Sequence, residues 1–139
     1  MGAPPAVRDA RASDIEAIFG IYNREVREGV ATFDTEPRVA GRDDGWLTER
    51  DTARHPVLVA EADGEVVGWA SLGEWSPRKA YARTAEESVY VREDWRGRGV
   101  GRALLEAIVE RGRAAGLGVL LARIAESSPP SVALHRAVR

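Results

Sequence analysis

Apolar residues follow two different spacings along this chain, and the order of the two predicts a layered α/β protein. Between residues 15 and 29, and again between 100 and 115, apolar side chains recur every three or four positions, as on one face of a helix. Short apolar runs typical of strands separate these helices. Strands are expected at 6–10, 57–62, 66–72, 87–92 and 119–124, with further short helices at 43–52 and around His135.

Small polar residues and glycines mark where these elements begin and end. Ser13 followed by Glu16 has the spacing of a capping box, which would open the first helix. Asp63-Gly64 lies between two apolar runs and predicts a two-residue hairpin turn. Gly116 is expected to end the long helix, because glycine readily adopts the left-handed conformation that follows a helix.

Length and composition place the chain among ordinary globular proteins. With 139 residues, it is predicted to form a single domain over residues 1–139, large enough for a hydrophobic core of its own. It is 44% hydrophobic and 30% charged, and no apolar run approaches the ~20 residues that cross a bilayer. The first residues lack the basic and apolar regions of a signal peptide, so a cytoplasmic location without membrane attachment is expected.

Absent residue types exclude several kinds of chemistry. The sequence contains no cysteine, which excludes a disulfide framework, a thiolate metal site and an acyl-cysteine intermediate. Its two histidines, His55 and His135, argue against a structural zinc site, and no metal is expected. A net charge of −2 argues against nucleic acid as a partner.

The glycine-rich turn Arg96-Gly97-Arg98-Gly99-Val100-Gly101 carries the strongest functional signal. It joins an apolar strand to an amphipathic helix, so main-chain N–H groups, a helix N-terminus and arginines meet at one point, which favours binding of a pyrophosphate. A Walker A loop is excluded because no Gly-Lys-Ser/Thr follows, and the glycine spacing differs from the dinucleotide-binding fingerprint. Two alternatives stay open on the pattern alone: a solvated connection, and an RNA-binding arginine patch, although no aromatic platform accompanies it.

The turn resembles the acyl-CoA loop of the GCN5-related N-acetyltransferase (GNAT) family, whose motif is Arg/Gln-x-x-Gly-x-Gly/Ala. The resemblance extends to the branch that acetylates phosphinothricin, methionine sulfone and methionine sulfoximine, and it covers nearly the whole chain. It implies a mixed central sheet with helices on both faces, acetyl-CoA as acetyl donor, direct transfer to the α-amine of a small amino acid, and a homodimer. The segments that carry this similarity are 33–37, 59–68, 78–81 and 84–91.

The resemblance assigns catalytic roles to two residues. Glu86 occupies the position of the family's base, which takes a proton from the substrate ammonium directly or through water and also contacts the substrate. His135 occupies the second catalytic position, where it would assist proton transfer or the departure of CoA. On the residues alone, the alternative is that Glu86 or Glu87 is a strand carboxylate facing solvent and that His135 is a surface residue.

Other positions would bind the two substrates. Phe33 would line the acceptor pocket, and Arg78 and Tyr81 would hold a carboxylate or the tail group, with a place in a surface loop as the alternative for Arg78. Relatives carry a basic residue where Ser76 stands here. Main-chain groups of the strand before the turn would pair with pantetheine, and a strand N–H near Tyr90 would polarise the thioester carbonyl. The implied cofactor-binding residues are Val89, Tyr90, Val91, Arg96, Gly97, Arg98, Gly99, Val100, Gly101, Arg102 and Ser128.

The sequence departs from the family pattern at its C-terminal end. The family continues beyond the histidine helix into two more strands, whereas this sequence stops at Val138-Arg139. The expected fold therefore lacks the C-terminal strand pair, which would leave a sheet edge and apolar surface uncovered. The alternative function is accordingly that of a truncated CoA-binding protein with little or no catalysis.

Overall fold

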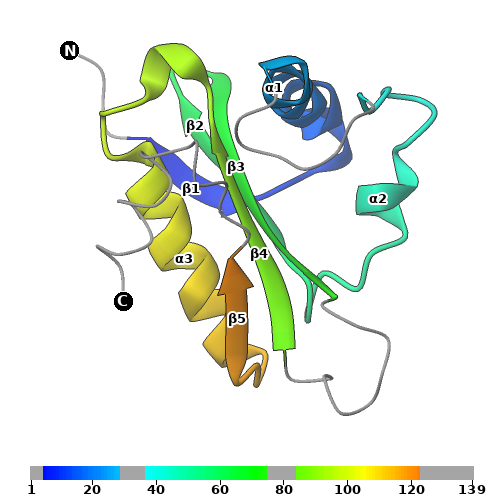
Figure 1. Cartoon of the computed structure of the whole chain (residues 1–139), viewed down its shortest axis with the longest axis vertical. Coiled ribbons are helices and arrows are strands. Elements are labelled where there is room, and N and C mark those ends of the chain that lie inside the picture. The colour runs from blue at the N-terminus through cyan, green and yellow to red at the C-terminus, as the bar shows by residue number, and fades with distance from the viewer. Residues whose placement is uncertain (1–4, 29–36, 75–83, 123–139) are drawn as a thin grey trace.

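A five-stranded mixed sheet forms the centre of the protein in the computed structural model, which describes residues 5–28, 37–74 and 84–122 (Figure 1). The strands lie side by side in chain order. Neighbours pair antiparallel except for β4 and β5, which are parallel, so the mixed sheet predicted from the sequence is confirmed. The strands are β1 (Ala6–Asp9), β2 (Val57–Ala62), β3 (Glu65–Glu74), β4 (Thr84–Val91) and β5 (Val119–Ala122).

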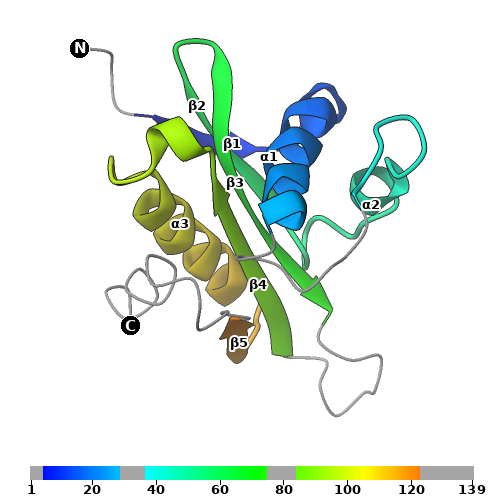
Figure 2. The ribbon, with the colours of Figure 1, turned by 45° about the horizontal axis from the view of Figure 1, so that its top comes forward.

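Helices cover both faces of this sheet, as expected (Figure 2). α1 (Ile15–Glu28) and α2 (Gly45–Thr48) pack on one face, and α3 (Val100–Ala114) packs on the other. Two short 3-10 turns complete the described elements. η1 (Ala12–Asp14) leads into α1, and η3 (Glu93–Trp95) follows β4 on the way to α3.

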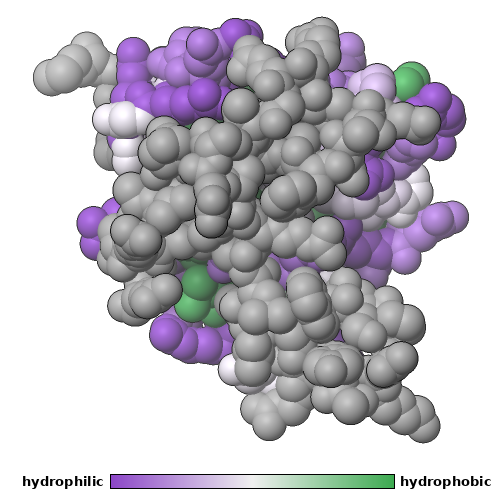
Figure 3. All heavy atoms as spheres, viewed as in Figure 1, coloured by the Kyte–Doolittle hydropathy of each residue, from purple (hydrophilic) through white to green (hydrophobic). Residues whose placement is uncertain are grey.

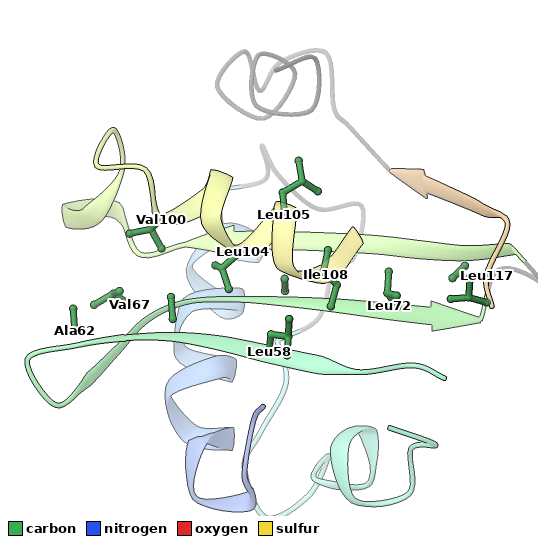
Figure 4. Close-up of a cluster of buried hydrophobic side chains, with 12 residues drawn as sticks. Leu58, Ala62, Val67, Leu72, Val100, Leu104, Leu105, Ile108 and Leu117 are labelled. Atoms are coloured by element: carbon green, nitrogen blue, oxygen red, sulfur yellow. The ribbon is translucent and has the colours of Figure 1, made fainter. Parts of the chain in front are cut away.

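Aliphatic and small side chains build the core between α3 and the sheet (Figure 4). Leu104 and Ile108 of α3 are fully buried there, as their helical spacing predicts. Burial of a side chain of this size stabilises the fold by about 1.5–3 kcal/mol relative to exposure, so this layer fixes α3 on the sheet. The buried members are Leu58, Ala60, Ala62, Val67, Ala70, Leu72, Ala85, Val100, Leu104, Leu105, Ile108 and Leu117.

The core on the α1 side contains more aromatic residues. Apolar residues of α1 face the sheet at the predicted helical spacing, and Leu47 of α2 joins them. Trp69 of β3 is 4% exposed and lies against this layer. The buried members are Ile15, Ile18, Phe19, Ile21, Tyr22, Leu47, Val57, Val59 and Trp69.

Entry into α1 differs from the predicted capping box at Ser13, which is wrong. The capping side chain is the carboxylate of Asp14, which accepts the N–H of Arg11 at 2.7 Å, because η1 begins before Ser13 and has Arg11 as its N-cap. The guanidinium of Arg8 also donates to both Asp14 oxygens, at 2.8 and 3.0 Å. These bonds outweigh the effect of burial and hold the pKa of the Asp14 carboxyl below its ordinary value.

Two other boundaries move, and one turn is confirmed. The helix expected over 43–52 is limited to α2, where Arg50 donates to the carbonyl of Trp46 and the chain leaves the helix. β4 begins at Thr84, before the predicted residue 87, because pairing with β3 and β5 extends the strand into a polar segment. At the hairpin, Asp63 and Gly64 have φ values of 53° and 80°, as a turn of type I′ requires.

The described surface is largely hydrophilic in the view of Figure 3. Val39 is the large hydrophobic side chain with substantial exposure among the described residues, at 45%. In the described part of the chain, no helix has the length and apolar character to cross a membrane. Within the same residues, His, Asp and Glu side chains do not gather into a group that could hold a metal ion.

Candidate functional site

The glycine-rich turn joins η3 to α3 through two residues in the left-handed region. Gly97 and Gly99 have φ values of 77° and 84°, a conformation that residues with a Cβ rarely adopt. A Cβ placed at either position would meet no atom within 4 Å, so open space lies beside the main chain of the turn. The glycines are therefore required by the main-chain conformation, and the space beside them is available to a ligand.

The first turn of α3 presents main-chain N–H groups at this point. The first i to i−4 hydrogen bond of α3 is donated by the N–H of Ala103 and accepted by the carbonyl of Gly99, just before the helix, at 3.1 Å. The N–H groups of Val100, Gly101 and Arg102 precede it and have no acceptor four residues earlier within the helix. Together with the partial positive charge of the helix N-terminus, they form an arrangement that binds anions such as phosphate.

The arginines around the turn are not equivalent. Arg92 donates to Asp94 at 2.7 and 3.0 Å and also reaches Glu65, and these acids raise the pKa of its guanidinium. Arg102 pairs with Glu106 on α3. Arg98, by contrast, makes no ion pair among the described residues, and its guanidinium lies 4.5 Å from the ring centre of Trp95. The charge of Arg98 therefore lies over Trp95 and outside any ion pair of the described residues.

Gly68 of β3 allows α3 to approach the sheet closely, a role that the sequence analysis missed. A Cβ at Gly68 would lie 3.0 Å from the Tyr90 carbonyl oxygen and from Leu104 Cδ1, and 3.1 Å from Val100 Cγ1. Any side chain here would push the first turn of α3 away from β4. An isolated glycine within an apolar strand is the signal that could have revealed this position.

Antiparallel pairing with β3 determines which main-chain groups of β4 point toward β3 and which point toward the opposite edge of the strand. The N–H of Arg92 donates to the carbonyl of Val67 at 2.8 Å, so the main chain of Arg92 faces β3. Because main-chain groups alternate between the two edges, those of Tyr90 also face β3, whereas those of Val89 and Val91 face the other edge. Among the described residues, β5 pairs only with the first half of β4. Val89 and Val91 thus carry the main-chain groups that an extended ligand could pair with.

The two adjacent glutamates of β4 lie on opposite faces of the sheet. Side chains alternate along a strand, and Ala85, Val89 and Val91 belong to the α3 side. Glu87 therefore points to the α3 side, where it is 6% exposed, and Glu86 points to the side of α1 and α2, where it is half-buried. Of the two, Glu86 shares its face with Tyr90 and the aromatic residues described next.

Five aromatic side chains from α1, α2, β3 and β4 form a contiguous group, here called the aromatic cluster. Trp69 stacks on Tyr90 with ring centres 4.8 Å apart, and Trp46 meets Trp69 edge-on at 5.3 Å. Such contacts contribute stability beyond the burial of area. The members are Phe19, Tyr22, Trp46, Trp69 and Tyr90.

The α1 side and the turn are also linked by charge. Arg24 of α1 forms an ion pair with Glu93 of η3, the element that leads from β4 into the turn. The aromatic cluster and the glycine-rich turn are therefore joined through β4 and through this ion pair, although they lie on different sides of the sheet.

Residues 16–138 match the Acetyltransferase (GNAT) family. The chain belongs to this family. It is 42% identical over 132 residues to the L-methionine sulfoximine/L-methionine sulfone acetyltransferase of Pseudomonas aeruginosa, a match that covers 94% of this chain and 77% of that protein. It is 38% identical over 136 residues to the phosphinothricin N-acetyltransferase of Alcaligenes faecalis, covering 94% of this chain and 67% of that one.

Solved structures of GNAT proteins share the fold. The yncA protein of Salmonella typhimurium, solved with its cofactor acetyl-CoA, matches with a TM-score of 0.92 and 32% identity, over 98% of this chain and 79% of that one. A phosphinothricin acetyltransferase from Sinorhizobium meliloti in complex with acetyl-CoA matches with a TM-score of 0.91 and 34% identity, over 98% and 74%. The predicted family and fold are confirmed, and the chain is an acetyltransferase by family.

Several residues expected at the site of this GNAT protein cannot be placed. The described residues include Glu86 and the whole of the strand, turn and helix from Val89 to Arg102. The remaining predicted positions lie outside the described residues: Phe33, Arg78, Tyr81, Ser128 and His135.

Proposed function

We propose that this protein transfers the acetyl group of acetyl-CoA to the α-amine of a small amino acid, with methionine sulfone, methionine sulfoximine and phosphinothricin as candidate acceptors. The observation that carries the proposal is the glycine-rich turn, whose left-handed Gly97 and Gly99 open onto the N-terminus of α3. In a GNAT protein similar to enzymes named for these acceptors, an anion-binding turn supports acetyl-CoA as the donor.

The described residues fit three successive parts of acetyl-CoA: the pyrophosphate, the pantetheine arm and the thioester. The N–H groups at the start of α3 would hold the pyrophosphate, with Arg98 as the accompanying cation. The outward main-chain groups of Val89 and Val91 would pair with the pantetheine arm in the manner of an added strand. One of these two N–H groups, rather than that of Tyr90, would donate to the thioester oxygen as negative charge develops there.

Glu86 would act as the base on the acceptor side of the sheet. An ammonium group has no lone pair, so Glu86 takes a proton from it, directly or through water, before the nitrogen attacks the thioester carbonyl carbon. The new C–N bond forms as the C–S bond breaks; the nitrogen then loses its second proton to become the amide N–H, and the sulfur leaves as a thiolate that gains a proton. We propose His135 for this proton transfer to the thiolate. With no cysteine in the chain, transfer is direct within a ternary complex.

Release of free thiol from acetyl-CoA tests this function. The protein is incubated with acetyl-CoA and each of the three acceptors, and the acetylated product is identified by mass. Glu86→Gln is expected to lower kcat by roughly 10²- to 10⁴-fold while acetyl-CoA binding is retained. Glu106→Gln, on the exposed side of α3, is the matched control and should leave kcat unchanged.

Two outcomes of this assay contradict the proposal in different ways. Equal turnover by Glu86→Gln would exclude Glu86 as the base. Binding of CoA without thiol release from any acceptor would favour the alternative, a CoA-binding protein with little or no catalysis.

We also propose a single domain over residues 1–139, a homodimer, a cytoplasmic location and no resident metal, nucleic acid or membrane partner. The resemblance to the family and the composition of the chain support these points. Light scattering of the purified protein measures the oligomeric state, and a monomer at micromolar concentration would contradict the homodimer.

A further inference from the structure

Arg38 lies at the edge of the aromatic cluster, and no acid of the described residues pairs with it. Its guanidinium carbon is 5.4 Å from the ring centre of Tyr22 and 5.9 Å from that of Trp46. Asn23 of α1 fixes its main chain through two hydrogen bonds, each of 2.7 Å, one to the Arg38 N–H and one to its carbonyl. Arg38 is half-buried, and within the described residues it makes no ion pair.

The other charges near Arg38 do not neutralise it. Asp43 is held by the guanidinium of Arg42 and the N–H of Val39, which lower the pKa of its carboxyl ahead of any contribution from Arg38. Arg50 also lies near Trp46, 4.8 Å from its ring centre. Two arginines therefore contact one indole ring of this cluster.

Arg50 differs from Arg38 because its donors are already used. It donates to the carbonyls of His55, Trp46 and Leu72, at 2.9, 3.1 and 2.7 Å. Burial, with a smaller contribution from the charge of Arg38, lowers the pKa of Arg50 to about 10. The positive charge of Arg50 is thus fixed within the fold, whereas the guanidinium of Arg38 has donors left for an oxygen atom.

A second, independent observation also points to a missing oxygen in this cluster. The indole N–H of Trp69 is buried and has no hydrogen-bond partner within the described part of the chain, in a side chain that is 4% exposed. Trp69 contacts both Tyr22 and Trp46, the two rings that hold Arg38. Buried donors are almost always paired in folded proteins, so an unpaired one indicates a group that binds there.

We propose that Arg38 binds an oxygen atom of the acceptor amino acid and that the aromatic cluster forms the wall of the acceptor site. This inference rests on the proposed function. The cluster shares its sheet face with Glu86, and the donor's turn lies on the other side of the sheet. The oxygen belongs either to the α-carboxylate or to the tail group of the acceptor, and both are recognised by the same planar guanidinium.

The test measures acceptor binding and turnover separately for wild type, Arg38→Gln, Arg38→Lys and the control Arg42→Gln. Binding of methionine sulfone to the CoA-loaded protein is followed by tryptophan fluorescence, since two tryptophans lie in the cluster. Arg38→Gln is expected to raise Kd and KM for the acceptor roughly ten- to hundredfold, with KM for acetyl-CoA unchanged. Arg38→Lys should recover part of the loss, and Arg42→Gln should behave as wild type.

Two analogues identify which oxygen Arg38 binds. If it binds the α-carboxylate, wild type prefers methionine sulfone over its carboxamide, and Arg38→Gln abolishes this preference. If it binds the tail, Arg38→Gln weakens the binding of phosphinothricin, whose tail is an anion, more than the binding of methionine sulfone. The preference for methionine sulfone over its carboxamide then persists.

The failures of the two proposals are distinguishable. Acceptor binding that depends on Arg38 without any thiol release would contradict the proposed function and leave this inference standing. Normal acetylation with an unchanged acceptor KM in Arg38→Gln would overturn the inference alone. It is also overturned if wild type binds no acceptor, or if Arg38→Gln raises KM for acetyl-CoA equally.

Discussion

The two faces of the sheet are built from different materials. On the α3 side, the buried layer consists of aliphatic and small side chains, and the helix approaches β3 so closely that Gly68 cannot carry a side chain. On the α1 side, the layer is rich in aromatic rings, two arginines contact one of these rings, and one buried indole N–H has no partner among the described residues. We infer that the first face is a rigid mount for the anion-binding turn and that the second is a surface adapted to a polar ligand.

This difference shows how one sheet can separate two binding tasks. A phosphate is bound by main-chain groups, which need an accurately placed helix and therefore a dense core behind it. An amino acid with a polar tail is bound by side chains, which need apolar surface with a few polar groups. β4 belongs to both tasks, because its main chain leads to the turn and its side chains at Tyr90 and Glu86 face the aromatic cluster.

Truncation of a fully buried side chain of α3 should produce the largest loss of stability. Leu104→Ala is expected to lower the free energy of unfolding by about 2–5 kcal/mol, because Leu104 is fully buried and a cavity would remain. Leu47→Ala in the short α2 is the matched change on the other face and should cost less. Urea unfolding measures both, and a smaller loss for Leu104→Ala than for Leu47→Ala would contradict the assignment of the rigid face.

The two glycines of β3, Gly68 and Gly73, make it possible to compare the same substitution on the two faces of the sheet. Gly68→Ala is expected to lower stability by about 1–3 kcal/mol and to weaken CoA binding, because its Cβ meets a carbonyl oxygen that cannot move freely. Gly73→Ala should be tolerated, since its Cβ would meet only the end of the Arg50 side chain, at 3.4 Å. Thermal unfolding and CoA titration compare the pair. Equal effects from both would remove close approach as the reason for Gly68.

The ion pair between Arg8 and Asp14 helps to hold the start of α1 against the sheet. Its contribution to the free energy of unfolding should depend on pH. Arg8 lowers the pKa of Asp14 in the folded state, so the contribution of Asp14 is complete above its unfolded pKa of about 4 and is lost as the pH falls through the folded value. Asp14→Asn should lose about 1.5 kcal/mol at pH 7 and show a flatter decline in acid. Parallel pH profiles of unfolding for the variant and wild type would contradict this.

Substitution of Arg98 should have the smallest of these effects. We expect it to change CoA binding only and not the binding of the acceptor. Arg98→Gln is expected to weaken CoA binding by about 1 kcal/mol, and less at high salt, since the guanidinium lies over Trp95 near the turn. Arg113→Gln, near the other end of α3 and paired with Glu110, is the control. Titration calorimetry at two salt concentrations measures the difference, and an equal loss in the control would exclude a local role for Arg98.

Local patterns predicted much of this architecture, because their causes lie within a few residues. The turn at Asp63-Gly64 follows from residue type and spacing alone. The stripes of α1 and α3 follow from helical periodicity in the same way. At Ser13 the local pattern failed, because Asp14 accepts the N–H of Arg11 and pairs with Arg8 of β1, a contact that depends on how β1 and η1 fold together.

Features assembled from distant segments could not be predicted. The aromatic cluster draws on four elements, and the pairing of Arg38 with Tyr22 and Trp46 exists only after they pack. Which main-chain groups of β4 face outward depends on its register with β3, and for the strand N–H expected near Tyr90 this register favours those of Val89 and Val91. Such facts depend on tertiary pairing rather than on spacing along the chain.

The division of tasks between the two faces is tested most directly by NMR of the ¹⁵N-labelled protein. CoA is added first and methionine sulfone second. The account predicts that CoA shifts the amide resonances of residues 97–102 with those of Val89 and Val91, and that the acceptor then shifts the indole N–H resonances of Trp46 and Trp69. It would be contradicted if CoA left the amides of the turn unmoved, or if the acceptor shifted those amides and not the two indoles.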